Sequence, residues 1–85
     1  PNIQYIEAKG DFVMIHTAER TVIATIALQQ ILKEIGSQFC RCHKSFVVNI
    51  TAIRRISGNR IFIQEKEIPI GRTYKEELLR RIKMI

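Results

Sequence analysis

The residues whose types could do chemistry gather in one stretch, residues 40–45, which holds two thiols, an imidazole, a hydroxyl and two cations. Such a set could bind a metal ion, act as a redox switch or contact a polyanion. A zinc site needs about four ligands that converge on one ion at about 2.0–2.3 Å. In an extended strand Cys40 and Cys42 would lie roughly 6.6 Å apart, with His43 on the opposite face. The only other histidine, His16, belongs to a different segment, so we predict no metal site.

Strand alternation gives the two cysteines a structural role. Cys40 and Cys42 are expected to face inward as small hydrophobic side chains, while Phe39, Arg41 and His43 face the other way. A disulfide between the two thiols would close a very small ring and distort the strand, and nothing indicates secretion, so reduced thiols are expected. One alternative stays open: a partly exposed cysteine beside the cations of this stretch would have a lowered pKa and would oxidise readily.

The other donors of this stretch suit contact with nucleic acid. Arg41 and Lys44 can neutralise phosphates, Ser45 is a short donor, and the apolar strand that follows would support them rigidly. The alternative is ordinary surface charge, with His43 packed and hydrogen-bonded at a strand end. An enzyme is not expected, because the sequence contains no nucleophile with a base and an orienting group, no acid pair in a segment that would bury it and no glycine-rich phosphate loop.

The net charge of +6 is unevenly distributed along the chain. Three basic residues stand against four acidic ones up to residue 38, and eleven stand against four after it. A concentrated basic surface favours a polyanionic partner, nucleic acid before membrane, although a solvated face without a partner would carry the same charge. There is no apolar run long enough to cross a bilayer and no signal-peptide pattern, so we expect a cytoplasmic protein.

The hydrophobic pattern predicts one mainly β domain over residues 1–85, with two short helices. Strands are predicted at residues 3–8, 12–17, 21–26, 39–42, 46–49, 53–57 and 60–64, and an edge strand at 68–70, where Pro69 cannot donate to a ladder. Apolar residues at 28, 31, 32 and 35 predict a short helix that Gly36 ends. The T-x-x-E pattern of residues 73–76 predicts a capping box that starts a terminal helix at Thr73. Because the sequence begins at Pro1 without an initiator methionine, we expect a piece of a longer protein.

Three segments together resemble the LytTR family of bacterial DNA-binding domains. They are FxRCHKSFVVN at residues 39–49, IPIGRxYKxxL at 68–78 and IxYIEAxGDF at 3–12, with the LxxI of 28–31 similar to the short helix of the family. The resemblance implies an elongated fold of ten short antiparallel strands, with a middle helix and a C-terminal helix. It also implies the output domain of a two-component response regulator that controls transcription, joined to an N-terminal receiver domain and binding direct repeats in double-stranded DNA as two copies.

Carried onto matching positions, the resemblance makes Lys44 and Arg72 candidates for reading bases in the major groove, with Lys9 and Asp11 of the first hairpin as a third contact. Chemistry supports Arg72, whose planar fork suits guanine. The phosphate-contact candidates are Arg41, Ser45, Tyr74 and Lys75, and the expected scaffold residues are His43 and Asn49. No cofactor, small-molecule substrate or membrane partner is expected.

Two other interpretations remain open from the residues. The same charge would serve an RNA-binding or general polyanion-binding β module, although an aromatic platform for single strands is weak here. The edge strand at Pro69 could instead pair with a protein partner.

Overall fold

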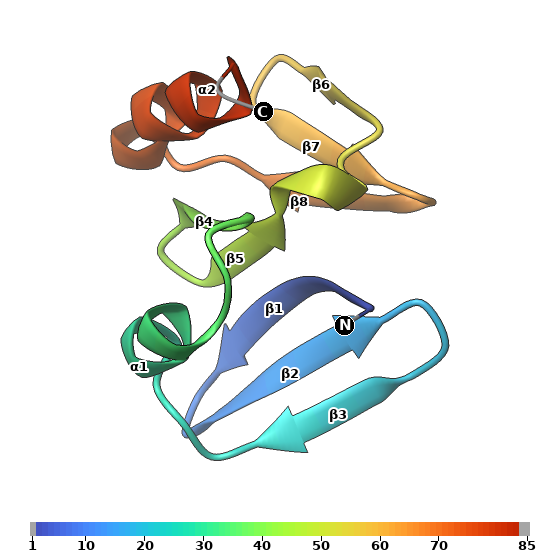
Figure 1. Ribbon diagram of the computed structural model, residues 1–85, viewed down its shortest axis with the longest axis vertical. Helices are drawn as coiled ribbons and strands as arrows, with labels where there is room; N and C mark the ends of the chain where they lie inside the picture. Colours follow the sequence, from blue (N-terminus) through green and yellow to red (C-terminus); the bar gives the residue numbers. More distant parts are fainter. Residues whose placement is uncertain (1, 84–85) are drawn as a thin grey trace.

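The protein is mainly β, with two antiparallel sheets and two short helices (Figure 1). The computed structural model describes residues 2–83. The sheet that we call sheet A has five strands and sheet B has three, and they follow one another along the longest axis of a molecule measuring 30 × 25 × 21 Å. The predicted fold class, short antiparallel strands with a middle helix and a C-terminal helix, is confirmed. Within residues 2–83 there are eight strands rather than the ten that the resemblance implies.

Sheet A has the strand order β3-β2-β1-β5-β4. Its strands are β1 (Ile3–Lys9), β2 (Phe12–Thr17), β3 (Thr21–Ala24), β4 (Phe39–His43) and β5 (Phe46–Asn49). The central strand β1 pairs with both β2 and β5, and its residue Glu7 lies opposite Phe46 at the start of β5. The β1–β2 turn and the β4–β5 turn therefore lie at the same end of the sheet.

Sheet B consists of β6 (Arg55–Ser57), β7 (Arg60–Ile63) and β8 (Lys66–Pro69) in that order. The predicted edge position is confirmed, but β8 covers Lys66–Pro69 rather than residues 68–70. Pro69 is its last residue, so its missing N–H removes no bond from the centre of a ladder. A 3₁₀ turn over Ile50–Ala52 leads into the sheet. The strand predicted from residue 53 begins only at Arg55, because Ile53 still caps this turn through its N–H bond to the carbonyl of Ile50.

The two helices each bury a narrow apolar stripe. Helix α1 (Leu28–Glu34) buries Leu28 and Ile31, and its N-cap residue Ala27 makes no capping hydrogen bond through its side chain. Helix α2 (Lys75–Lys83) buries Leu78. The chain enters α2 through a 3₁₀ turn over Arg72–Tyr74, whose N-cap residue is Gly71 and has no side chain to cap it. The predicted capping box at Thr73 is therefore wrong: Gly71 is bonded to sheet A and begins the turn before Thr73 is reached.

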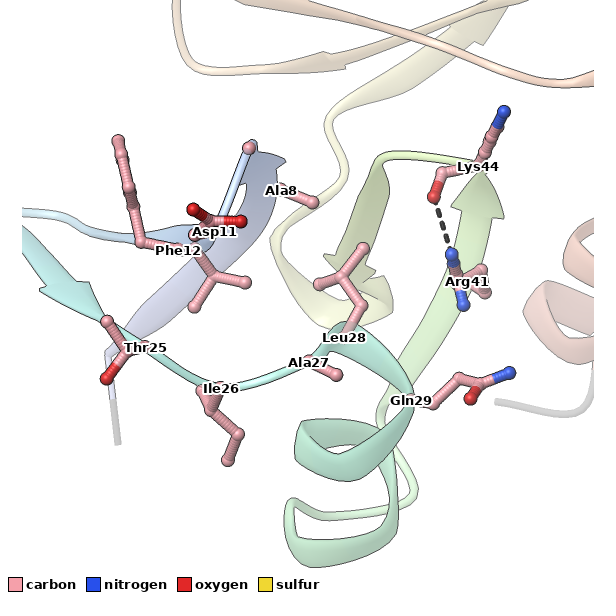
Figure 2. Close-up of a pocket in the computed structure, with 12 residues that line it drawn as sticks. Ala8, Asp11, Phe12, Thr25, Ile26, Ala27, Leu28, Gln29, Arg41 and Lys44 are labelled. Carbon is pink, nitrogen blue, oxygen red and sulfur yellow. Dashed lines mark hydrogen bonds between the residues drawn. The ribbon is translucent and has the colours of Figure 1, made fainter.

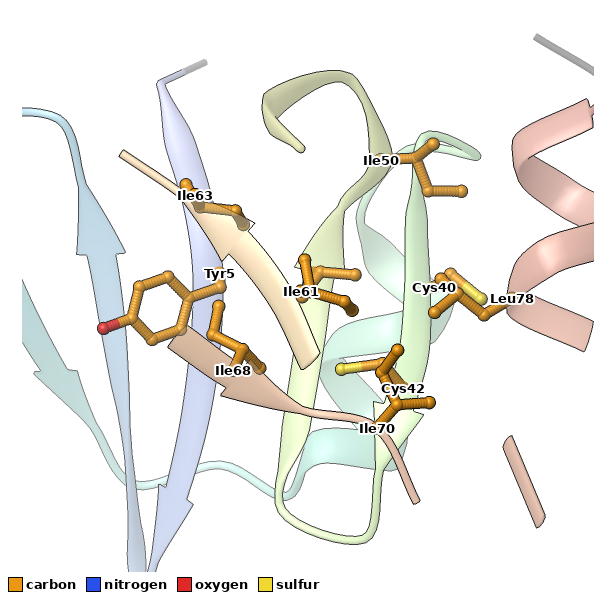
Figure 3. Packing of buried hydrophobic residues seen from close by; sticks show 10 residues of the cluster. Tyr5, Cys40, Cys42, Ile50, Ile61, Ile63, Ile68, Ile70 and Leu78 are labelled. Atoms are coloured by element: carbon orange, nitrogen blue, oxygen red, sulfur yellow. The ribbon is translucent and has the colours of Figure 1, made fainter. Parts of the chain in front are cut away.

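The hydrophobic core has two parts, one on each face of sheet A. One cluster contains Tyr5, Cys40, Cys42 and Val48 with sheet B and Leu78 of α2, and Figure 3 shows Cys42 near Ile70 and Cys40 near Leu78. The other contains Ile6, Phe39 and Val47 with α1. Neighbouring residues of one strand thus enter opposite clusters, as strand alternation requires. The inward position predicted for both cysteines is confirmed.

A β-bulge at Cys42 changes the direction of the residue that follows. Arg41 pairs with Val47 and His43 pairs with Phe46, so Cys42 is an extra residue in β4. The bulge places the His43 ring edge-on to the Phe46 ring, with 5.5 Å between the ring centroids. Phe46 in turn packs against the cluster that contains the cysteines. The prediction that His43 shares the outer face with Phe39 is wrong, because regular alternation ends at the bulge.

Candidate nucleic-acid interface

The two basic junctions singled out in the sequence lie side by side. The backbone N–H of Gly71 donates to the carbonyl of Cys42, the bulged residue of β4, at 2.8 Å. A methyl group at Gly71 would lie 3.0 Å from Cδ2 of Tyr74 and 3.6 Å from the Cα of His43. This close approach joins the segment that carries Arg72 directly to the segment that carries Lys44.

Two side chains hold the β4–β5 turn: Arg41, a predicted phosphate contact, and His43, a predicted scaffold residue. The Arg41 guanidinium donates from Nε to the carbonyl of His43 at 3.1 Å and from Nη2 to that of Lys44 at 2.5 Å, the latter drawn in Figure 2. The backbone N–H of Ser45 donates to Nδ1 of His43 at 3.0 Å. Lys44 itself is exposed. The turn is therefore fixed from within while its lysine faces solvent.

The β1–β2 turn is attached to the β4–β5 turn. The backbone N–H of Ala8 donates to the carbonyl of Ser45 at 2.8 Å. Gly10 has φ +58°, a left-handed conformation that glycine adopts without strain, and Lys9 and Asp11 on either side of it are exposed. Three turns that are distant in the sequence thus form one connected surface.

A groove of about 420 Å³ lies between the β1–β2 turn and the β4–β5 turn. Figure 2 shows Asp11 and Phe12 on one side, Arg41 and Lys44 on the other, and Leu28 of α1 between them. One wall thus carries a carboxylate and the other wall carries cations. Such a groove can accommodate both an anion and a hydrogen-bond donor.

The segment from Arg72 to Lys75 presents further donors. Arg72 is exposed, and within residues 2–83 its side chain makes no hydrogen bond or ion pair. Tyr74 lies half-buried with its ring centroid 5.8 Å from Cζ of Arg41. Lys75 donates through Nζ to Oδ1 of Asn59 at 2.9 Å, which holds the ammonium group against a neutral partner. A phosphate could replace that partner at little electrostatic cost.

Asn49, a predicted scaffold residue, is buried, and both ends of its side-chain amide are hydrogen-bonded. Its Nδ2 donates to the carbonyl of Ile3 at 2.8 Å, and its Oδ1 accepts from the backbone N–H of Thr51 at 3.0 Å and from the Thr51 hydroxyl at 2.7 Å. These bonds join β1 to the end of β5. Asn49 lies away from the three turns and shapes the sheet that carries them.

The thiols do not form a reactive site. Burial raises the pKa of Cys42 to about 12, and burial also raises the pKa of Cys40 despite the nearby charge of Arg81. The condition for a readily oxidised cysteine, partial exposure with a lowered pKa, is met by neither residue. Within residues 2–83 no group of three or more histidine, cysteine or acidic side chains is placed to hold a metal ion.

His16 lies at the other end of sheet A and takes part in packing. Its ring stacks on Tyr5 with centroids 4.2 Å apart, and its Nδ1 lies 3.1 Å from the Thr21 hydroxyl. Burial lowers the pKa of His16, and the carboxylate of Glu7, 3.6 Å from Nε2, opposes that effect. Burial raises the pKa of Tyr5. His16 is remote from the three turns.

The sequence does not single out two residues that help to position this surface, Arg81 and Asn59. Arg81 donates to the carbonyl of Phe39 at 3.2 Å and also to that of Ser37, which ties α2 to the start of β4. Asn59 holds Lys75, and its carbonyl accepts from the N–H of Ile70 at 2.9 Å. These contacts join segments far apart in the chain, and no local pattern marks them.

No helix in the described part of the chain is long and apolar enough to cross a membrane.

Comparison with known proteins accords with this geometry. The chain matches the family described as the LytTr DNA-binding domain over residues 1–83. Its structure is similar to a LytTr DNA-binding domain from a Bacillus cereus protein described as a methyl-accepting/DNA response regulator, with a TM-score of 0.86 and 23% sequence identity over 95% of this chain and 81% of that chain. Comparison with curated proteins gave no match. Since the family match covers nearly the whole sequence, the chain belongs to the LytTr DNA-binding domain family.

Proposed function

We propose that this domain binds double-stranded DNA sequence-specifically as the cytoplasmic output domain of a bacterial transcriptional response regulator. The observation that carries the proposal is the connection of three turns through the Gly71–Cys42 and Ala8–Ser45 backbone bonds. In this proposal a receiver domain precedes the domain in the same chain. Two copies bind a direct repeat, and each inserts its turns into the major groove.

Side-chain chemistry and exposure support the proposed roles. Arg72 and Lys44 are exposed cations on adjacent segments, and a bidentate arginine contact to guanine discriminates between bases by about 1–3 kcal/mol. Lys9 and Asp11 make the third contact, in which the carboxylate accepts from a cytosine amine. Ser45, Tyr74 and Lys75 contact phosphates and set the register of the domain on the duplex.

The test is selection of bound sequences from a random duplex pool with the wild-type domain and with Arg72→Ala, at near-physiological salt. We expect the wild type to recover a spaced direct repeat. Arg72→Ala should lose about 1–3 kcal/mol of discrimination at one position of each half-site while keeping non-specific affinity.

Arg20→Ala is the matched control, because Arg20 is an exposed arginine in the β2–β3 turn at the other end of the strands. Recovery of unselected DNA by the wild type would contradict the proposal, and a steeper loss with Arg20→Ala than with Arg72→Ala would contradict the assigned surface.

A further inference from the structure

We infer that Arg41 is a positioning residue for base recognition, rather than a phosphate contact, and that its guanidinium couples the Lys44 turn to the Arg72 segment. The inference rests on the proposed function and gives Arg41 a different role within it. It means that the two base-reading segments act as one unit.

The first observation is the use of the guanidinium inside the protein. Its Nε–H and one N–H of Nη2 bond the carbonyls of two residues in the same turn, His43 and Lys44. A planar fork can hold two carbonyls at a fixed separation, which the single ammonium group of lysine cannot do. The direction of the Lys44 side chain is therefore set by Arg41.

The second observation is the position of the same guanidinium beside the other segment. Cζ of Arg41 lies 5.8 Å from the centroid of the Tyr74 ring, within the range of a cation–π contact. A methyl group at Gly71 would lie 3.0 Å from the Tyr74 ring, and the Tyr74 N–H donates to the Gly71 carbonyl at 3.0 Å. A shift of Arg41 would thus reach the 3₁₀ turn that carries Arg72.

The third observation is the geometry that surrounds Arg41. The Gly71 N–H bonds the carbonyl of Cys42, the residue directly after Arg41, and the bulge there interrupts regular pairing with β5. The backbone at this junction has lost part of its ladder, so side-chain bonds determine its shape. Arg41 supplies two of them.

The experiment compares Arg41→Lys and Arg41→Gln, with Arg20→Gln as the charge-matched control. A phosphate contact would survive in Arg41→Lys, whereas Arg41→Gln would reduce the slope of log K against log salt by about 0.9. A positioning role predicts a different result for each variant. Both Arg41→Lys and Arg41→Gln should lose about tenfold in the ratio of specific to non-specific affinity, and Arg41→Gln should keep the salt slope of the wild type.

A second readout needs no DNA. Backbone amide resonances of the free variants should shift at Lys44 and Ser45 and also across residues 71–74, while Arg20→Gln shifts neither group. Shifts confined to the β4–β5 turn would overturn the coupling. Wild-type discrimination in Arg41→Lys together with a shallower slope in Arg41→Gln would restore Arg41 to the phosphate contacts.

These outcomes separate the inference from the function on which it rests. A wild-type domain without any sequence preference would overturn the proposed function and the recognition role of Arg41 with it, while the amide shifts would still report whether the two segments are coupled. If Arg41→Gln fails to fold, as judged by urea unfolding, Arg41→Lys alone distinguishes a point charge from a planar fork.

Discussion

At the scale of single residues, the cations of this surface divide by what they already bind. Arg41 and Lys75 have partners within the protein, whereas the side chains of Lys44 and Arg72 make no hydrogen bond or ion pair in the described residues. An unpartnered exposed cation keeps all its donors for a ligand. In the proposed function, base reading is therefore assigned to Lys44 and Arg72, and alignment of the domain on DNA is assigned to the other two cations.

Lys75→Ala should weaken binding to all DNA sequences alike. Its ammonium group bonds the neutral Asn59, so its charge remains available for a phosphate. The salt slope should become shallower by about 0.9 for one lost phosphate contact, without a change in sequence preference. Fluorescence anisotropy with specific and scrambled duplexes at several salt concentrations measures both quantities. Lys33→Ala, an exposed lysine on α1, is the control. An equal change in the control would show that only total charge matters.

At the scale of elements, the position of α2 depends on one of two neighbouring arginines. Arg81 reaches the carbonyls of Ser37 and Phe39, while Arg80 forms an exposed ion pair with Glu77 one turn away. A charged hydrogen bond to a partly buried carbonyl contributes more than an exposed ion pair. Of the two arginines, Arg81 is thus the one that fastens the helix to β4, beside the buried Leu78.

We expect Arg81→Ala to lower the free energy of unfolding by about 1.5–3 kcal/mol, and Arg80→Ala by less than about 1 kcal/mol. Urea denaturation of both variants, followed by circular dichroism, measures the difference. Equal effects would mean that helix propensity and surface charge, rather than the bonds to β4, determine the position of α2.

Much of this element arrangement could be predicted from the sequence. Alternating apolar residues located the strands, and the i, i+3, i+4 spacing located α1, because both patterns are local consequences of one buried face. The bulge at Cys42 and the 3₁₀ entry to α2 could not be predicted. Both lie at the bond between Gly71 and Cys42, which joins segments almost thirty residues apart. The Thr73 motif therefore suggested a cap that the tertiary contact replaces.

The sequence names candidate residues for the site, whereas the contacts between them come only from the structure. Charge and motif spacing located Lys44 and Arg72 in two separate junctions, but the sequence does not say that the junctions touch. The internal bonds of Arg41 have no local signature either, because an arginine in a basic stretch suits a phosphate as well as a carbonyl.

At the scale of the whole molecule, the two hydrophobic clusters share the strands of sheet A. Tyr5 and Ile6 enter opposite clusters from β1, as Val48 and Val47 do from β5. Neither cluster can be exposed without disturbing strands that line the other. The domain should therefore unfold as one cooperative unit.

Alkaline pH should reduce the stability of this unit. The pKa of Cys42 is raised from its ordinary value of 9.0 to about 12 because the thiol is buried. The unfolded chain releases this proton above about pH 9 while the folded chain retains it, so the free energy of unfolding falls as pH rises from about 9 towards 12. Raised pKa values of Cys40 and Tyr5 act in the same direction.

Cys42→Ala should flatten this dependence in urea titrations at about pH 7, 9 and 11. Val48→Ala, which truncates a non-titrating side chain of the same cluster, should lower stability equally at every pH. A pH dependence unchanged by Cys42→Ala would assign the effect to other groups.

The two-sided burial of sheet A also governs how the chain can change in length. Deleting one residue from β1 would exchange the side chains that this strand supplies to the two clusters and send Tyr5 and Ile6 into cavities of the wrong shape. A deletion in β5 would do the same to Val47 and Val48. Asp11, Lys44 and Arg72 lie in turns outside this alternation, and Lys9 is the last residue of β1. A protein engineer could therefore rewrite the turns by substitution, or transplant them from a relative, while the strand lengths must be left untouched.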